Sequence, residues 1–107
     1  MLANLLHHLD YHLRKLRSPE WRHVERTHLL HEPRCQACGT SYKPQVHHIA
    51  PFHLRPELEL VEVNLITLCM SGNECHLKIG HLGNWRGFNP RVRLDAANAL
   101  RQKAAAA

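Results

Sequence analysis

The sequence has no long hydrophobic segment. No apolar run in the 107 residues approaches the roughly 20 residues that a membrane-spanning helix requires, so we expect no membrane partner. The first 16 residues include His, Asp, Arg and Lys. We therefore expect no secretory signal, and a cytoplasmic, reducing location. We also find no internal repeat.

Acidic residues are few, with 9 Asp and Glu against 14 Lys and Arg. The formal charge of +5 favours a polyanionic partner or an acidic surface, although many basic domains bind no nucleic acid. Histidine, in contrast, is abundant, with 11 residues. Because imidazole ligates metals and exchanges protons near neutral pH, this enrichment indicates metal binding or acid–base chemistry.

Cysteine is scarce, and its spacing is informative. The four thiols form two close pairs about thirty residues apart, Cys35 with Cys38 and Cys69 with Cys75. This pattern is more typical of a metal site than of a disulfide framework. Four thiolates leave no open coordination position, so we expect a structural zinc, which a domain of this size can need. The alternative is four reduced cysteines buried as small hydrophobic residues.

Two turns must allow the thiols to converge. Gly39 follows the first pair and relieves the tight turn behind it. The second pair is separated by Met-Ser-Gly-Asn-Glu, which must bulge between the ligands; Gly72 and Asn73 make that bulge feasible.

Periodicity and capping signals predict four helices and one strand. Leucines at three- and four-residue steps predict an amphipathic helix over 2–16, which either packs on this domain or docks onto a larger partner. The next helix follows Ser18-Pro19, which supply an N-cap and a first-turn proline, and should bury Trp21, Val24, His28 and Leu29. The predicted elements are helices over 19–31, 74–79 and from 89–90 onward, a strand over 45–49, and an ordered loop over 52–63.

Several motifs follow one another in a fixed order between residues 34 and 81: Cys-x2-Cys, His-His, Asn, Cys and Cys-His. With the segments HHIAPFHLRPELEL, NLITLC and CHLKIGHLGNW, they resemble the HNH endonuclease family, in particular phage and bacterial members whose zinc knot frames the nuclease centre. The resemblance implies a small α+β fold, with a ββα-metal (His-Me finger) core held by the knot. We expect an N-terminal helical extension over 1–33, the nuclease core over 34–88, and a C-terminal helix and Ala-rich tail over 89–107.

The resemblance also implies roles for individual residues. His48 matches the general base, and His47 and His76 match ligands of a catalytic divalent ion. Adjacent strand residues point to opposite sides, so His47 and His48 can serve a metal and a water separately. Asn64 matches the family's middle asparagine, which braces the loop and orients the strand that carries the base.

His81 is a candidate third ligand with two open interpretations. It follows His76 by five residues, which places it about 140° around an ideal helix, whereas colicin-type members carry two ligands four apart. Gly80 can end the helix and let His81 turn back toward the metal. Alternatively, His81 only packs near Trp85.

The implied reaction is hydrolysis of DNA phosphodiesters to 5′-phosphate and 3′-hydroxyl ends, with Mg²⁺, Mn²⁺ or Ni²⁺ as the catalytic ion. Lys78, Arg86 and Arg55 are candidate contacts to DNA phosphates, and specificity is expected to be low. Family members occur in bacterial and phage systems, including defence. Two alternatives stay open: a non-catalytic, zinc-stabilised nucleic-acid-binding module, and a toxin-like nuclease domain held by an immunity partner.

Overall fold

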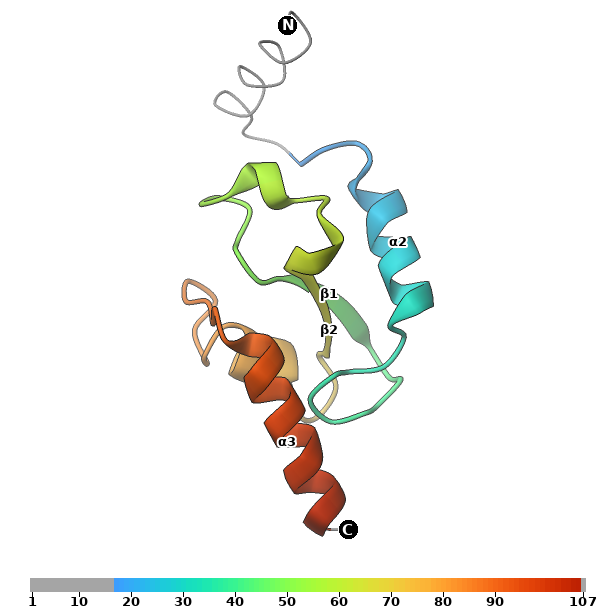
Figure 1. The fold of residues 1–107 in the computed structure, drawn as a ribbon, viewed down its shortest axis with the longest axis vertical. Coiled ribbons are helices and arrows are strands. Elements are labelled where there is room, and N and C mark those ends of the chain that lie inside the picture. The colour runs from blue at the N-terminus through green and yellow to red at the C-terminus, as the bar shows by residue number, and fades with distance from the viewer. Residues whose placement is uncertain (1–16, 107) are drawn as a thin grey trace, which may run out of the picture.

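The computed structural model describes residues 17–106, and the predicted helix over 2–16 lies outside them. The elements follow in the order α2 (Trp21–His31), β1 (Pro44–His48), two short 3-10 turns (Pro56–Leu58 and Glu62–Asn64), β2 (Leu65–Cys69), η3 (His76–Gly80) and α3 (Val92–Ala106). The strands form one antiparallel hairpin (Figure 1). The predicted α+β class is confirmed.

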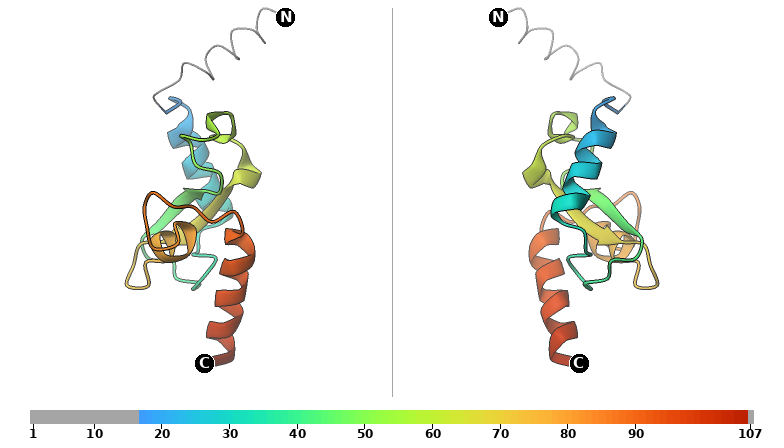
Figure 2. Two further views of the ribbon diagram at one scale, coloured as in Figure 1. Left: turned by 90° about the vertical axis from the view of Figure 1, so that its left-hand side faces the viewer. Right: turned by 90° about the vertical axis from the view of Figure 1, so that its right-hand side faces the viewer.

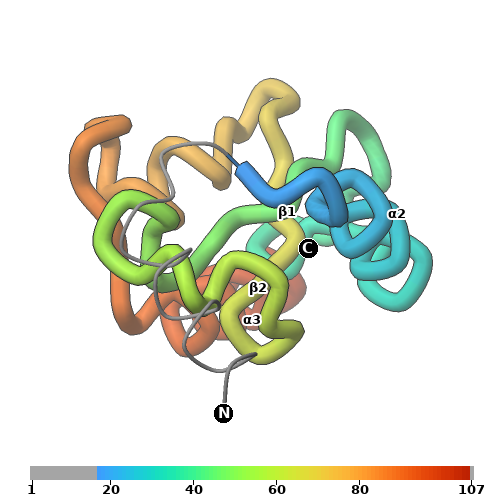
Figure 3. Tube along the Cα trace, turned by 90° about the horizontal axis from the view of Figure 1, so that it is seen from above, coloured from blue at the N-terminus to red at the C-terminus, as the bar shows by residue number. Residues whose placement is uncertain are grey.

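The hairpin separates two helical layers. Helix α2 packs on one side of the strands, and η3 and α3 lie on the other (Figures 1 and 3). The register pairs His47 with Ile66 and His48 with Leu65. Because neighbouring strand residues face opposite ways, this hairpin directs one histidine toward η3 and the next toward α2.

Strand β2 is the centre of the core. All five of its residues are buried, three of them apolar side chains with no exposed surface, and they pack with Cys35, Cys75, Val92 and Ala96. The far half of α3 projects away from this core, and residues 101–106 are exposed (Figures 1 and 2). The apolar core is therefore small and has the four thiols at its edge.

Side-chain hydrogen bonds join both long helices to β2. Buried His28 lies between the carboxylates of Glu32, at 3.1 Å, and Glu62, at 2.7 Å. Glu32 accepts the Thr67 N–H at 2.8 Å, and Arg93 of α3 donates to the Leu65 carbonyl at 2.7 Å. These polar contacts fix the helices where apolar surface is limited.

The predicted boundaries differ only locally from those observed. Helix α2 begins at Trp21 because 19–20 form a turn, in which the Ser18 hydroxyl accepts the Glu20 N–H at 3.2 Å. The strand spans 44–48 instead of 45–49, and the loop over 52–63 contains the two 3-10 turns. Asn89 accepts the Arg91 N–H at 2.9 Å, as expected of a residue that caps α3. Within residues 17–106, no helix is both long and apolar enough to cross a bilayer.

Candidate functional site

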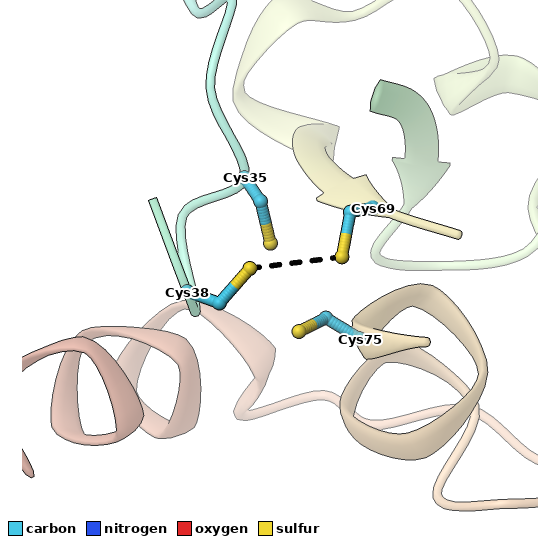
Figure 4. Close-up of side chains that lie close together, drawn as sticks. All are labelled: Cys35, Cys38, Cys69 and Cys75. Carbon is cyan, nitrogen blue, oxygen red and sulfur yellow. Dashed lines mark hydrogen bonds between the residues drawn. The ribbon is translucent and has the colours of Figure 1, made fainter. Parts of the chain in front are cut away.

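The four cysteines converge at one end of the hairpin. Their sulfur atoms all lie within 4.8 Å of one another, and the Cys38 and Cys69 sulfurs are 3.7 Å apart (Figure 4). Cys69 ends β2, and Cys75 immediately precedes η3. The four cysteines therefore connect the loop before β1, the end of the hairpin and the start of η3. One metal ion bound by four thiolates requires sulfur atoms that converge in this way.

The turns around the thiols differ in one detail from the prediction. Gly39 has a φ of +81°, a region that favours glycine, and its N–H donates to the Cys35 carbonyl at 2.8 Å. In the second turn, however, Gly72 and Asn73 do not take the left-handed conformation. Glu74 does, with a φ of 49° and its N–H on the Ser71 carbonyl at 2.9 Å. The backbone between the two thiols therefore takes its left-handed conformation at Glu74, one residue before Cys75.

The electrostatics of the thiols fit a cation. Burial raises the pKa of Cys35, and burial together with the nearby Cys35 sulfur raises that of Cys75. Burial would also raise the pKa of Cys69, but donors that include the Ser71 hydroxyl, 3.2 Å away, lower it to about 6. Crowded, buried sulfurs resist ionising together, and a bound Zn²⁺ removes that penalty. The cluster could hold zinc as predicted.

Three histidines form a second cluster on the η3 side of the hairpin. The candidate ligand nitrogens of His47, His76 and His81 lie within 4.8 Å of one another. Their ring centroids are 4.9 Å apart for His47 and His76, and 4.7 Å for His47 and His81. Both interpretations of His81 hold in the structure. Its ring joins the histidine cluster, and its centroid also lies 4.9 Å from that of Trp85.

The shape of η3 explains how His81 reaches the cluster. This element is a π-helical turn and not the α-helix predicted over 74–79. The His81 N–H donates to the His76 carbonyl at 3.1 Å, so five residues close one turn. The separation of about 140° holds only for an α-helix. In the wider turn, residues five apart lie on nearly the same face.

Hydrogen bonds occupy Nδ1 of His76 and of His81, which leaves Nε2 of these two rings for a metal. His76 Nδ1 contacts the Gln45 amide oxygen at 2.8 Å, and His81 Nδ1 donates to the Gly87 carbonyl at 2.8 Å. His47 Nε2 is buried and has no hydrogen-bond partner among the described residues. An unpaired buried imidazole nitrogen is costly unless a ligand occupies it, so this cluster fits a divalent ion.

Burial also keeps the His47 and His76 rings neutral. It lowers the pKa of His47 to about 3 and that of His76 to about 4, and neighbouring histidines add to both shifts. Neutral imidazole is the form that binds metals. Gly80 leaves room for the His47 ring, since a Cβ at that position would lie 3.1 Å from His47 Cε1.

Because the His47 ring is buried, we expect the free energy of unfolding to decrease in acid. Its unfolded pKa is near 6.5 and its folded pKa about 3, so the unfolded chain binds more protons between these values. The contribution of this ring to the free energy of unfolding is therefore fully present above pH 6.5 and decreases as the pH falls below that value. Between pH 7 and 5 we expect the wild type to lose about 2 kcal/mol more than the His47→Asn variant. Denaturant unfolding with one zinc per chain measures this; equal losses would contradict it.

His48 faces α2, opposite to His47. Its ring lies 4.4 Å from that of Trp21, and its Nε2 lies 2.9 Å from the Glu59 carbonyl. Because a carbonyl only accepts, Nε2 carries the proton and the lone pair is on Nδ1. The Arg17 guanidinium lies 3.4 Å from that nitrogen. Burial lowers the pKa of His48, and Arg17 lowers it further.

Asn64 forms hydrogen bonds to the two residues that follow β1 and to Leu58. Its side chain accepts the Ala50 N–H at 2.8 Å and donates to the Ala50 carbonyl at 3.1 Å and the Leu58 carbonyl at 3.2 Å. Its backbone carbonyl accepts the Ile49 N–H at 2.8 Å. These contacts have the geometry that a bracing role requires.

Removing these hydrogen bonds should be costly. We expect Asn64→Ala to lower the free energy of unfolding by about 2 kcal/mol, because it leaves partly buried backbone groups of Ala50 and Leu58 without these partners. Asn73→Ala, in an exposed turn, is the matched control and should change stability by less than about 0.5 kcal/mol. Urea unfolding of both variants measures this. Similar midpoints for the two variants would show that Asn64 braces nothing.

The two sides of the hairpin share one pocket. It has a volume of about 350 Å³ and is lined by both His48 and the three clustered histidines. It also includes Arg17 and Phe52, which the sequence did not single out, and Trp85, whose ring centroid lies 5.3 Å from that of His76. His53, for which we expected no role, lines it as well. No spacing signal connects Arg17 to His48, 31 residues away.

The candidate phosphate contacts are not in the pocket. Lys78, Arg86 and Arg55 are exposed and are absent from its lining. Arg55 forms an ion pair with Glu57. The three side chains therefore stay candidates for contacts to a longer substrate, outside the pocket.

The thiol cluster, the histidine-bearing hairpin and the helical turn that returns to it make up a small domain with two sites that could hold a metal ion. Residues 35–82 match the family model for HNH endonuclease. The resemblance predicted from the sequence is confirmed by this match for residues 35–82. Comparisons with curated proteins and with solved structures found no significant match.

Proposed function

We propose that the chain is a metal-dependent endonuclease that hydrolyses phosphodiester bonds in DNA. The observation that carries the proposal is the single pocket with His48 on one side and the cluster of His47, His76 and His81 on the other. A base beside a cation site, with space between them for a phosphate, is the arrangement that hydrolysis requires.

His48 acts as the general base in this proposal. Its Nε2–H donates to the Glu59 carbonyl, which fixes the ring orientation and places the lone pair on Nδ1. The Arg17 guanidinium lies 3.4 Å from Nδ1, so a water that gives its proton to this nitrogen takes the place of that contact. Burial lowers the pKa of this imidazole and keeps it unprotonated at neutral pH. Proton removal by a positioned imidazole makes water a competent nucleophile toward phosphorus.

His47, His76 and His81 would hold the divalent ion. The ion would supply positive charge to stabilise the transition state and the departing 3′ oxygen. Three imidazole donors suit Mn²⁺ or Ni²⁺ better than Mg²⁺, which prefers oxygen. Mn²⁺ or Ni²⁺ should therefore support cleavage at least as well as Mg²⁺, and a strict Mg²⁺ requirement would contradict this ligand set.

Supercoiled plasmid tests the proposal directly. The wild type with Mn²⁺, Ni²⁺ or Mg²⁺ should produce nicked circles with 5′-phosphate and 3′-hydroxyl ends, since one proposed active centre per chain acts on one strand. His48→Ala should not. Plasmid binding without cleavage under any divalent ion would instead support the non-catalytic binding module.

A further inference from the structure

Arg17 reaches the pocket from outside the family domain. It lies 18 residues before the matched segment 35–82, yet its side chain lines the same pocket as His48. That side chain is 49% exposed. Part of the guanidinium is therefore accessible to a ligand in the pocket.

Four groups hold this guanidinium in place. It lies over the Phe52 ring at 4.7 Å and the Trp21 ring at 5.7 Å. It also contacts a Glu59 carboxylate oxygen at 3.6 Å and His48 Nδ1 at 3.4 Å. A long side chain normally loses considerable entropy when it binds a ligand, and an arginine already held by stacking loses less.

Glu59 acts as the positioning residue for this segment. Its carboxylate is fully buried and also accepts the Ser18 N–H, at 3.1 and 3.3 Å to its two oxygens. The backbone carbonyl of Glu59 accepts a hydrogen bond from His48 Nε2–H. One buried residue therefore sets the position of both the arginine and the base.

We propose that Arg17 is an anion-binding residue that holds a nonbridging oxygen of the reacting phosphodiester beside His48. This deepens the proposed function and rests on it. A guanidinium offers five N–H donors in a planar fork that matches phosphate oxygens. The contacts to Glu59 and His48 both involve Nη1, and Arg17 lines the pocket with Nη2 and Nε outside these two contacts. The residues before the family domain thus supply part of the active site.

Binding of inorganic phosphate tests the subsite without any cleavage. We would titrate phosphate into protein that carries zinc in the thiol cluster and no other divalent ion, by calorimetry at pH 7.5. Arg17→Gln should bind phosphate about tenfold more weakly than the wild type, and Arg17→Lys should be intermediate. Arg22→Gln, at an exposed position of α2 outside the pocket, should bind as the wild type does. Zinc content and circular dichroism verify that each variant is folded.

A small diester tests where Arg17 acts. Bis(4-nitrophenyl) phosphate has one phosphate, so attraction to distant DNA charge plays no part. With Mn²⁺, we expect kcat/KM to fall about a hundredfold in Arg17→Gln and to be unchanged in Arg22→Gln. A loss on plasmid alone, with full activity on the diester, would overturn the proposal.

The two experiments separate this inference from the proposed function. Absence of phosphate binding by the wild type, or equal affinity in Arg17→Gln and Arg22→Gln, overturns the anion subsite even if DNA is cleaved. Arg17-dependent phosphate binding without cleavage of either substrate supports the subsite as an anion site and contradicts the nuclease activity.

Discussion

Replacing His48 by alanine should lower the rate of plasmid cleavage by a factor of about 10²–10⁴, the contribution typical of a general base. The reason is local: Nδ1 of this ring is the nitrogen left with a lone pair once the Glu59 carbonyl has bound Nε2. The ligand cluster lies on the other side of the hairpin, so affinity for the divalent ion should stay near the wild-type value. Initial nicking rates at saturating Mn²⁺ and calorimetric Mn²⁺ titration measure the two quantities.

A second variant distinguishes chemistry from folding. His48→Gln can still donate to the Glu59 carbonyl but offers no imidazole base, so it should be as inactive as His48→Ala and nearer to the wild type in stability. His23→Ala, an exposed histidine of α2, is the matched control and should retain full activity. Wild-type rates in both His48 variants would remove His48 from the mechanism.

Removal of zinc from the thiol cluster should unfold the domain. Structural zinc sites contribute about 10–16 kcal/mol of apparent binding free energy, comparable to or larger than the roughly 5–15 kcal/mol total stability of a small domain. Here the thiols join the loop before β1 to β2 and η3, and they form one edge of a small core. Without the ion, little apolar surface is left to hold these segments together.

Titration with a strong chelator, followed by circular dichroism and a colorimetric zinc assay, tests this dependence. We expect one zinc per chain to be released together with the helical signal, and re-addition of Zn²⁺ to restore both. Cys75→Ser should show the same loss without chelator. His47→Asn, which leaves the thiols intact, should keep its zinc. A chelated protein with an unchanged unfolding midpoint would show that the knot is dispensable.

Several elements of the fold followed from local signals, whereas strand β2, the centre of the core, was not among the elements that these signals predicted. Cys35-x2-Cys38-Gly39 predicted the thiol turn, and a proline after Ile49 correctly limited the strand to within one residue. The helix over 74–79 was predicted at the right place but with the wrong geometry. A π-turn and an α-turn have the same residue preferences, and packing against the hairpin decides between them.

The sequence by itself determined the inventory of the candidate site: four cysteines, the adjacent His47 and His48 on one strand, Asn64 and His76, in an order that indicates the family. These signals are local, because ligand spacing and strand alternation depend on a few bonds. Only the tertiary structure decided that His81 joins the histidine cluster and that Arg17 lies against His48. The position of His81 depends on the wider helical turn, and that of Arg17 depends on a contact between segments far apart in the chain. Residue spacing in the sequence predicts neither.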